Sequence, residues 1–113
     1  MTKVRRGEVW WVDFGNPIGR EQAGRRLAVV VSADALNASP AGVVIVVPCT
    51  TSPRGLPSHV EIDDGSGLSE VSYAKAEDVK SVSVERLVER AGGISDEALF
   101  TLTRALRFLL DIP

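Results

Sequence analysis

Leu27-Ala-Val-Val-Val-Ser32 and Val43-Val-Ile-Val-Val-Pro-Cys49 are the two stretches that decide the fold. Each is a short, continuous apolar run rich in β-branched residues, which is typical of a strand buried on both faces. The residues between them, Asn37 to Gly42, have the composition of a turn. We expect the second strand to stop near Pro48, because proline has no N–H group to donate to a neighbouring strand. The pair therefore predicts a β-sheet at the core of the protein.

Weaker strand patterns lie on both sides of this pair. Gly7 to Phe14 alternates between two faces, and Ser58 to Ile62 alternates in the same way. The stretch from Val71 to Val82 fits one longer, irregular strand region. After a helical turn at Val84 to Leu87, a last short strand is expected at Leu87 to Ala91. Several short strands in one small chain predict a strongly curved sheet or a small barrel.

The clearest helix is expected at the end of the chain. Ser95 is a candidate N-cap, and Asp96 and Glu97 would lie in the first turn, where the helix dipole favours acidic side chains. An apolar stripe at helical spacing follows, consisting of Ala98, Leu99, Leu102, Ala105, Leu106, Leu109 and Leu110. The fold class is therefore mainly β with α, and residues 1–113 are expected to form a single domain with a C-terminal amphipathic helix.

Composition places the chain among ordinary globular proteins, with 44% hydrophobic and 25% charged residues in a length of 113. No apolar run approaches the roughly 18 residues of a membrane-spanning helix. The basic segment Met1 to Gly7 lacks the apolar core of a signal peptide. We therefore expect a cytoplasmic protein with no membrane partner. Cys49 is the only cysteine, so it cannot form a disulfide within the chain and is expected to be a small buried residue.

Charge is distributed unevenly along the chain, although its formal net value is only −2. Residues 1–60 carry seven basic and four acidic side chains, a balance of +3, whereas residues 61–113 carry six basic and eleven acidic side chains, a balance of −5. A local basic surface can bind phosphate even when the whole protein is acidic. The asymmetry fits such a surface and fits an ordinary solvated exterior equally well.

Several kinds of chemistry are disfavoured by what the chain lacks. His59 is the only histidine, so no pair of histidines can share acid and base roles within one chain, and its strand position predicts a surface or edge residue. No His, Cys and carboxylate set has the spacing of a zinc site, and no glycine-rich loop precedes a helix. Glu61, Asp63 and Asp64 could gather a magnesium ion, but adjacent acids at a turn are more often solvated. We therefore expect no metal and no cofactor.

Two polar segments remain as candidates for chemistry. Gly19-Arg-Glu-Gln-Ala-Gly-Arg-Arg26 combines arginines, which bind phosphate bidentately, with a glutamate that could accept a proton. Pro48-Cys-Thr-Thr-Ser52 places three hydroxyl groups directly after a buried strand. Together these groups suit RNA transphosphoesterification, in which the 2′-hydroxyl of the substrate attacks phosphorus and no metal is needed. Spacing alone also fits a solvated arginine loop and an ordinary turn.

The same segments carry a resemblance to a known family. Arg6-Gly-Glu-Val-Trp-Trp-Val-Asp-Phe14, Gly19-x-Glu-Gln-x-Gly-x-Arg26 and Val46-Val-Pro-Cys-Thr-Thr-Ser52 resemble the first three strands and intervening loops of MazF/PemK toxins, in the same order and spacing. These toxins are endoribonucleases, or mRNA interferases, of type II toxin–antitoxin systems. Weaker similarity extends to the terminal helix, so the resemblance covers nearly the whole chain.

The resemblance implies a small SH3-like (PemK/CcdB-type) β-barrel and a homodimer. It implies sequence-specific, metal-independent cleavage of single-stranded RNA, including mRNA, to a 2′,3′-cyclic phosphate and a 5′-hydroxyl. Such cleavage would inhibit translation and growth. It also implies a cognate antitoxin whose acidic tail occupies the RNA groove.

The resemblance also assigns residues. The catalytic arginine corresponds to Arg26, the catalytic hydroxyl to Thr50 and the loop glutamate to Glu21. Contacts to RNA are expected from the polar residues around these three, namely Arg20, Gln22, Arg25, Thr51, Ser52, Arg54, Glu77 and Lys80.

Two positions depart from the usual family pattern. Leu27 stands where most members carry proline, which would leave Arg26 less rigidly placed. Arg20 replaces a usual Ser or His and adds charge near the scissile phosphate. Two aromatic residues, Trp11 and Phe14, could stack on bases, although packing in the core or a dimer interface is the commoner role of such side chains.

Two alternatives belong to other functional classes. A non-enzymatic CcdB-like gyrase inhibitor would share the architecture, but it relies on a C-terminal tryptophan, and this chain ends Leu109-Leu-Asp-Ile-Pro113. A plain binding module would not need the pairing of Arg26 with Thr50. Incubation with a long RNA separates both alternatives from a nuclease.

Overall fold

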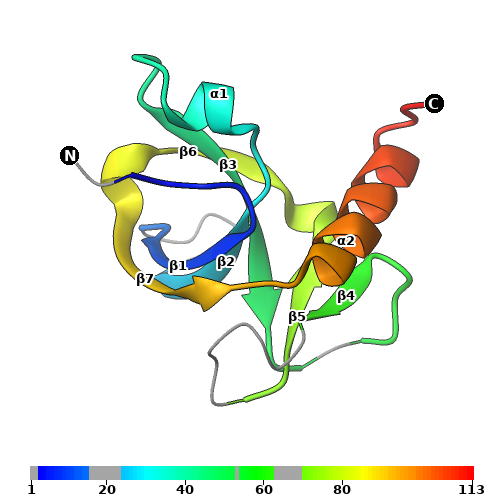
Figure 1. Cartoon of the computed structure of the whole chain (residues 1–113). Helices are drawn as coiled ribbons and strands as arrows, with labels where there is room; N and C mark the ends of the chain where they lie inside the picture. The colour runs from blue at the N-terminus through cyan, green and yellow to red at the C-terminus, as the bar shows by residue number, and fades with distance from the viewer. Residues whose placement is uncertain (1–2, 16–23, 53, 63–69) are drawn as a thin grey trace.

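The computed structural model describes residues 3–15, 24–52, 54–62 and 70–113 (Figure 1). Its strands are β1 (Glu8–Asp13), β2 (Arg25–Val30), β3 (Val43–Thr50), β4 (His59–Ile62), β5 (Ser72–Lys75), β6 (Lys80–Ser83) and β7 (Leu87–Gly93). Its helices are α1 (Asp34–Asn37), α2 (Asp96–Leu109) and the 3-10 turns η2 (Ala76–Asp78) and η3 (Val84–Arg86).

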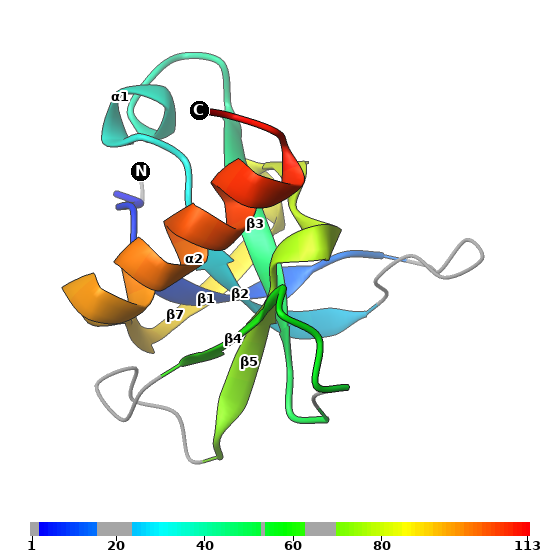
Figure 2. The same cartoon turned by 90° about the vertical axis from the view of Figure 1, so that its right-hand side faces the viewer.

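The strands form one antiparallel sheet in the order β4-β5-β3-β2-β1-β7. β6 lies off this path and pairs with the first half of β3, whereas β5 pairs with its last two residues. Among the described residues no ladder joins β7 to β4, so the sheet is strongly curved but not closed (Figures 1 and 2). The prediction of a mainly β fold with a C-terminal helix is confirmed, whereas the closed SH3-like barrel is not observed.

Apolar side chains are buried on both faces of the sheet. β1 alternates as predicted, because Val9 belongs to one core cluster while Trp10, Val12 and Phe14 belong to the other. The first cluster lies between the sheet and α2, where Leu102 is fully buried. The second cluster lies on the opposite face of the sheet and includes Ala28 of β2 and Val46 of β3. That second face carries the candidate site described below.

β3 differs from the prediction at its C-terminal end. The strand does not stop at Pro48, which pairs with Ala28, but continues to Thr50. Val46 is the last residue of β3 that pairs with β6, and Cys49 is the first that pairs with β5. Because Pro48 lies at this change of partner, its missing N–H is tolerated inside the strand.

Other local predictions are refined in the same way. The single strand expected from Val71 to Val82 is two strands separated by η2, and the turn expected from residue 37 is preceded by the short helix α1. The helical turn expected after residue 83 is η3, and the last strand is two residues longer than expected. η2 separates β5, which pairs with β4 and the end of β3, from β6, which pairs with the first half of β3.

α2 begins as predicted and ends differently. The Ser95 hydroxyl accepts a hydrogen bond from the Ala98 amide at 3.1 Å, which confirms the N-cap. Leu102 is 1% exposed, but Leu109 and Leu110 are 42% and 57% exposed, so the apolar stripe continues beyond the part of the helix that packs on the sheet. No helix in the described ranges is long and apolar enough to cross a membrane.

Arg6 joins three parts of the fold. Its amide donates to Asp34 at 2.6 Å, and its guanidinium donates to the carbonyl of Val31 and to the Thr103 hydroxyl of α2. One of the basic residues counted in the first half of the chain therefore ties the terminal helix to the strand region.

Candidate functional site

Arg26 and Thr50 lie at the same end of the neighbouring antiparallel strands β2 and β3. Ala28 and Pro48 form the last pair of this ladder at that end, and the same register extended by two residues in each strand would set Arg26 opposite Thr50. Directly opposite residues of an antiparallel pair point to the same face, so the guanidinium and the hydroxyl share one face. The Thr50 oxygen accepts the Ser52 amide at 3.1 Å, which leaves its own O–H able to donate. The two residues predicted to be catalytic therefore lie at the same end of the β2–β3 pair.

Lys80 belongs to the same face. It pairs with Val46 of β3, and its ammonium lies 5.5 Å from the centre of the Phe14 ring. Phe14 is only 8% exposed and belongs to the second core cluster, so the expectation that it packs in the core is confirmed. The Phe14 ring makes a cation–π contact with the Lys80 ammonium. The ring is too buried to serve as a stacking surface for a base.

The backbone around Leu27 is held by strand pairing with β1. Leu27 pairs with Trp11 of β1 and packs, partly buried, against the first core cluster. Arg26 pairs with Val12 in the same ladder. The backbone at Arg26 is therefore fixed by strand pairing on β1, and a proline is not needed to stiffen it.

Arg86 was missed by sequence reasoning. Its guanidinium donates to the carbonyl of Asp13 at 3.1 Å, and Asp13 is paired with Arg25. This places a further cation at the end of the sheet that carries Arg26. The pattern of η3 predicts a helical turn there, but nothing in the local sequence indicates that the side chain of Arg86 reaches back to β1.

The remaining predicted contact residues divide into two groups. Four of them are exposed around the pair, namely Arg25, Thr51, Ser52 and Arg54. Arg20, Gln22 and the candidate base Glu21 fall within residues 16–23, which lie outside the described residues. The roles expected for these three residues therefore stay predictions.

Glu77 lies in a hydrogen-bonded cluster with β4. Its two carboxylate oxygens accept from the Ser58 hydroxyl at 2.8 Å and from His59 Nε2 at 2.7 Å. Although partial burial disfavours its charged form, hydrogen bonds from its own backbone, from His59 and from Ser58 hold the pKa of Glu77 below its ordinary value. Because protein donors occupy both oxygens, Glu77 is poorly placed to accept a proton from a substrate.

The prediction that His59 lies at the surface or at an edge is confirmed for the edge. His59 lies on β4 at the edge of the sheet, but its side chain is 2% exposed and is not a surface group. Cys49 is buried as expected, and burial raises the pKa of its thiol to about 12, which makes it a poor nucleophile. In the described part of the chain no three His, Cys, Asp or Glu side chains gather as a metal ion would require, and Asp63 and Asp64 lie outside that part.

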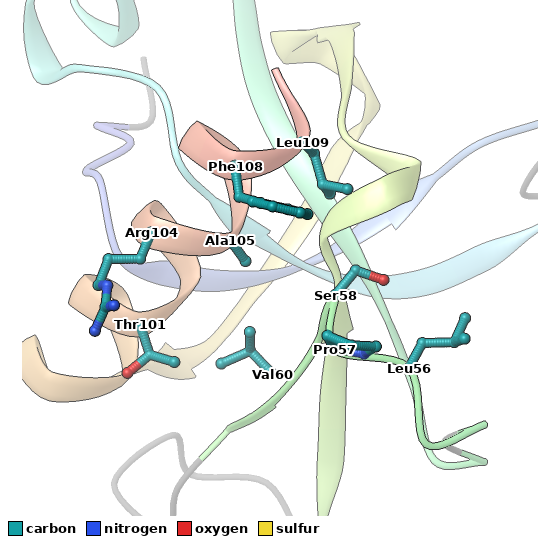
Figure 3. A pocket seen from close by; sticks show the side chains of 9 residues that line it. All are labelled: Leu56, Pro57, Ser58, Val60, Thr101, Arg104, Ala105, Phe108 and Leu109. Atoms are coloured by element: carbon teal, nitrogen blue, oxygen red, sulfur yellow. The ribbon is translucent and has the colours of Figure 1, made fainter. Parts of the chain in front are cut away.

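An apolar groove of about 500 Å³ lies on the other side of β4, against α2. Figure 3 shows α2 residues facing the segment around Pro57 across this groove. It is lined by Leu56, Pro57, Ser58, Val60, Thr101, Arg104, Ala105, Phe108 and Leu109. Val60 belongs to the α2 side of the sheet, so the groove opens on the face opposite to Arg26 and Thr50.

Comparison with known proteins decides the family. Residues 5–110 match the family described as PemK-like, MazF-like toxin of type II toxin-antitoxin system. The chain belongs to this family. The chain is 37% identical to Endoribonuclease MazF9 of Mycobacterium tuberculosis, a match covering 96% of this chain and 98% of the relative. It is 35% identical to Endoribonuclease toxin MazF of Escherichia coli, covering 92% and 91%.

Solved structures agree with this assignment. MazF from Deinococcus radiodurans superposes on the MazF-like toxin with a TM-score of 0.84 at 27% identity, covering 98% of this chain and 99% of that one. A MazE-MazF structure from the same organism gives a TM-score of 0.82 at 27% identity over the full length of both chains. The prediction of an enzyme, a MazF-type endoribonuclease, is confirmed at the family level, and the CcdB-like alternative is not favoured.

Proposed function

We propose that this MazF-like toxin cleaves single-stranded RNA at short sequences by attack of the substrate's own 2′-hydroxyl. The products would be a 2′,3′-cyclic phosphate and a 5′-hydroxyl. The observation that carries the proposal is the position of Arg26 and Thr50 at the same end and on the same face of the neighbouring strands β2 and β3. Because the substrate supplies the nucleophile, the protein has to supply charge stabilisation, proton transfer and positioning, and no metal is required.

The groups at the site fit distinct roles. Arg26 would hold the phosphoryl oxygens in its planar fork and stabilise the charge of the crowded phosphorane. Thr50 would donate its O–H to the same group, since its oxygen already accepts the Ser52 amide. A guanidinium is a poor base at neutral pH, so we assign the proton acceptor to Glu21. Glu77 is the weaker candidate, because Ser58 and His59 occupy its oxygens.

The partners follow from the charge of the same face. Arg25, Arg54, Lys80 and Arg86 surround the pair with cations suited to RNA phosphates. The same cations suit the acidic tail of a cognate antitoxin, which would inhibit the toxin by covering the site. Structures of MazF relatives with their antitoxins, such as the MazE-MazF structures of Deinococcus radiodurans, support such a partner. We further propose that the toxin acts as a homodimer in the cytoplasm and inhibits translation and growth.

The proposal is tested by incubating the purified toxin with a long single-stranded RNA in excess EDTA and analysing the new ends. We expect cleavage at a few short sequences, with cyclic phosphate and 5′-hydroxyl termini. Cleavage that disappears on chelation and returns with magnesium would overturn the mechanism. Intact RNA combined with inhibition of gyrase would instead support the CcdB-like alternative.

A further inference from the structure

We propose that His59 is a positioning residue, which fixes the segment after Thr50 by joining the backbone of Arg54 to Glu77. The proposal deepens the proposed RNA cleavage and rests on it. The His59 ring contacts the Arg54 amide and the Glu77 carboxylate, and its side chain is only 2% exposed. Its role is therefore to place other groups, and not to contact the substrate.

Both ring nitrogens of His59 are engaged with different parts of the chain. The Arg54 amide lies 3.4 Å from Nδ1, and Nε2 lies 2.7 Å from Glu77 Oε2. A backbone amide can only donate, so Nδ1 accepts and the proton resides on Nε2, which donates to the carboxylate. The neutral ring thus links the segment after β3 to η2 with one acceptor and one donor.

Further bonds fasten the same segment to η2. The Ser58 hydroxyl donates to the second oxygen of Glu77 at 2.8 Å, and the Ala76 amide donates to the Ser58 carbonyl at 3.0 Å. The His59 amide donates to the Leu56 carbonyl at 3.0 Å, which closes the turn between Arg54 and β4. We call the hydrogen bonds that join Arg54, His59, Ser58 and Glu77 the clamp. In the clamp, the His59 ring connects the Arg54 amide to the Glu77 carboxylate. The His59 ring is buried, whereas Arg54 is exposed and the Glu77 side chain is 32% exposed.

Strand register connects the clamp to the site. Thr50 pairs with Tyr73, and Tyr73 pairs with Glu61, so these three residues share a face. His59 lies two residues before Glu61 and shares that face as well. The clamp consequently holds the backbone at Arg54 on the side of the sheet that presents Thr50, while the Arg54 side chain is exposed. An exposed cation is thereby available to RNA phosphates on that side of the sheet.

This arrangement predicts a specific kinetic effect. Loss of the clamp would leave the Arg54 backbone without a fixed position and would weaken RNA binding. Arg26 and Thr50 would keep their positions, because each belongs to a paired strand. We expect His59→Ala and His59→Gln to raise KM about three- to tenfold, the size of one lost hydrogen bond. kcat should stay within about twofold. Gln retains a donor that can reach Glu77 but has no acceptor at the place of Nδ1, so it isolates the contact with Arg54.

A double-mutant cycle separates positioning from general destabilisation. In an Arg54→Ala background the cation to be positioned is gone, so adding His59→Gln should change KM less than about twofold. Arg107→Ala, which removes an exposed cation from α2, is the matched control and should not reduce the effect of His59→Gln. Equal effects of His59→Gln in the parent and in Arg54→Ala would overturn the proposal, as would an unchanged KM in folded His59 variants.

Amide exchange in the parent protein tests the clamp without any substitution. The Arg54 amide should exchange with solvent more slowly than the amide of exposed Thr51, and equal exchange rates would overturn the proposal even if the His59 variants fail to fold. The proposed function fails separately. A parent that protects the Arg54 amide but leaves RNA intact would retain the clamp and lose the nuclease assignment.

Discussion

Arg26 is the residue on which the proposed chemistry depends most. Its role is electrostatic and it lies exposed at the beginning of β2, so Arg26→Ala should fold normally. We expect it to slow single-turnover cleavage of a short RNA about a hundredfold to a thousandfold, as expected for a lost donor to a charged transition state. Arg26→Lys keeps the charge and loses the fork, so only slight rescue is expected.

The controls for this series are Thr50→Ala, Glu21→Gln and Arg107→Ala. Thr50→Ala should slow the reaction by a similar or smaller factor, and Arg107→Ala should leave the rate unchanged. If folded Arg26→Ala cleaves at the parent rate, the site assignment is wrong. If Glu21→Gln is the variant that leaves the cleavage rate unchanged, the proton acceptor is another group.

The ionisation of Glu77 makes the free energy of unfolding depend on pH. Its pKa is lowered in the folded state, chiefly by hydrogen bonds that outweigh partial burial, so its ionised form stabilises the fold above the pH range in which an unfolded glutamate titrates. This contribution is lost as pH falls through the lower folded-state pKa. Glu77→Gln should therefore reduce the free energy of unfolding at pH 7, and the difference from the parent should shrink below about pH 4. Urea titrations at several pH values measure this, and a difference that is independent of pH would contradict it.

At the scale of elements, α2 is held by its middle turns. Leu102 is 1% exposed inside the first core cluster, so Leu102→Ala should lower the free energy of unfolding by about 2–5 kcal/mol. Leu110→Ala alters a side chain that is 57% exposed and should cost less than about 1 kcal/mol. Chemical denaturation compares the two. Equal costs would mean that the C-terminal turn is covered in solution.

The elements that could be predicted are those whose signal is local. The buried strands, the alternation of β1 and the Ser95 cap each depend on residues within one segment. The passage of β3 through Pro48 could not be predicted, because it depends on where β6 gives way to β5. The burial of His59 and the reach of Arg86 depend on η2 and β1, which are distant in sequence. The assignment of Arg26 and Thr50 to one site comes from the family resemblance, because strand spacing alone would not have selected these two residues.

At the scale of the whole molecule, the charge asymmetry predicts how RNA binding responds to salt. The cations gather at one end of the sheet, so each phosphate contact releases condensed counterions. The logarithm of the binding constant should fall linearly with the logarithm of the salt concentration, by about 0.7 per contact for a single strand. Arg54→Ala should reduce this slope by about one contact, measured with catalytically inactive Arg26→Ala as the common background. An unchanged slope would place Arg54 outside the RNA path.

The homodimer is the second prediction at this scale. Phe100 and Phe108 on α2 are 64% and 83% exposed, an amount of apolar surface that a second copy would remove from water. We expect sedimentation to give twice the chain mass at micromolar concentration. Phe108→Glu should shift the protein toward the monomer, whereas the neighbouring Arg107→Ala should not. A monomeric parent with full activity would contradict the prediction.

The alkylation rate of the buried cysteine can measure how often the sheet opens locally. Cys49 lies in β3 one residue before Thr50, is 6% exposed and has a thiol pKa raised by burial to about 12. An alkylating reagent can therefore modify it only in molecules whose central strand has opened. The labelling rate in native buffer then reports the frequency of such openings at the position next to Thr50. A ligand that seats on the cationic face should slow the labelling in proportion to its occupancy, whichever ligand it is.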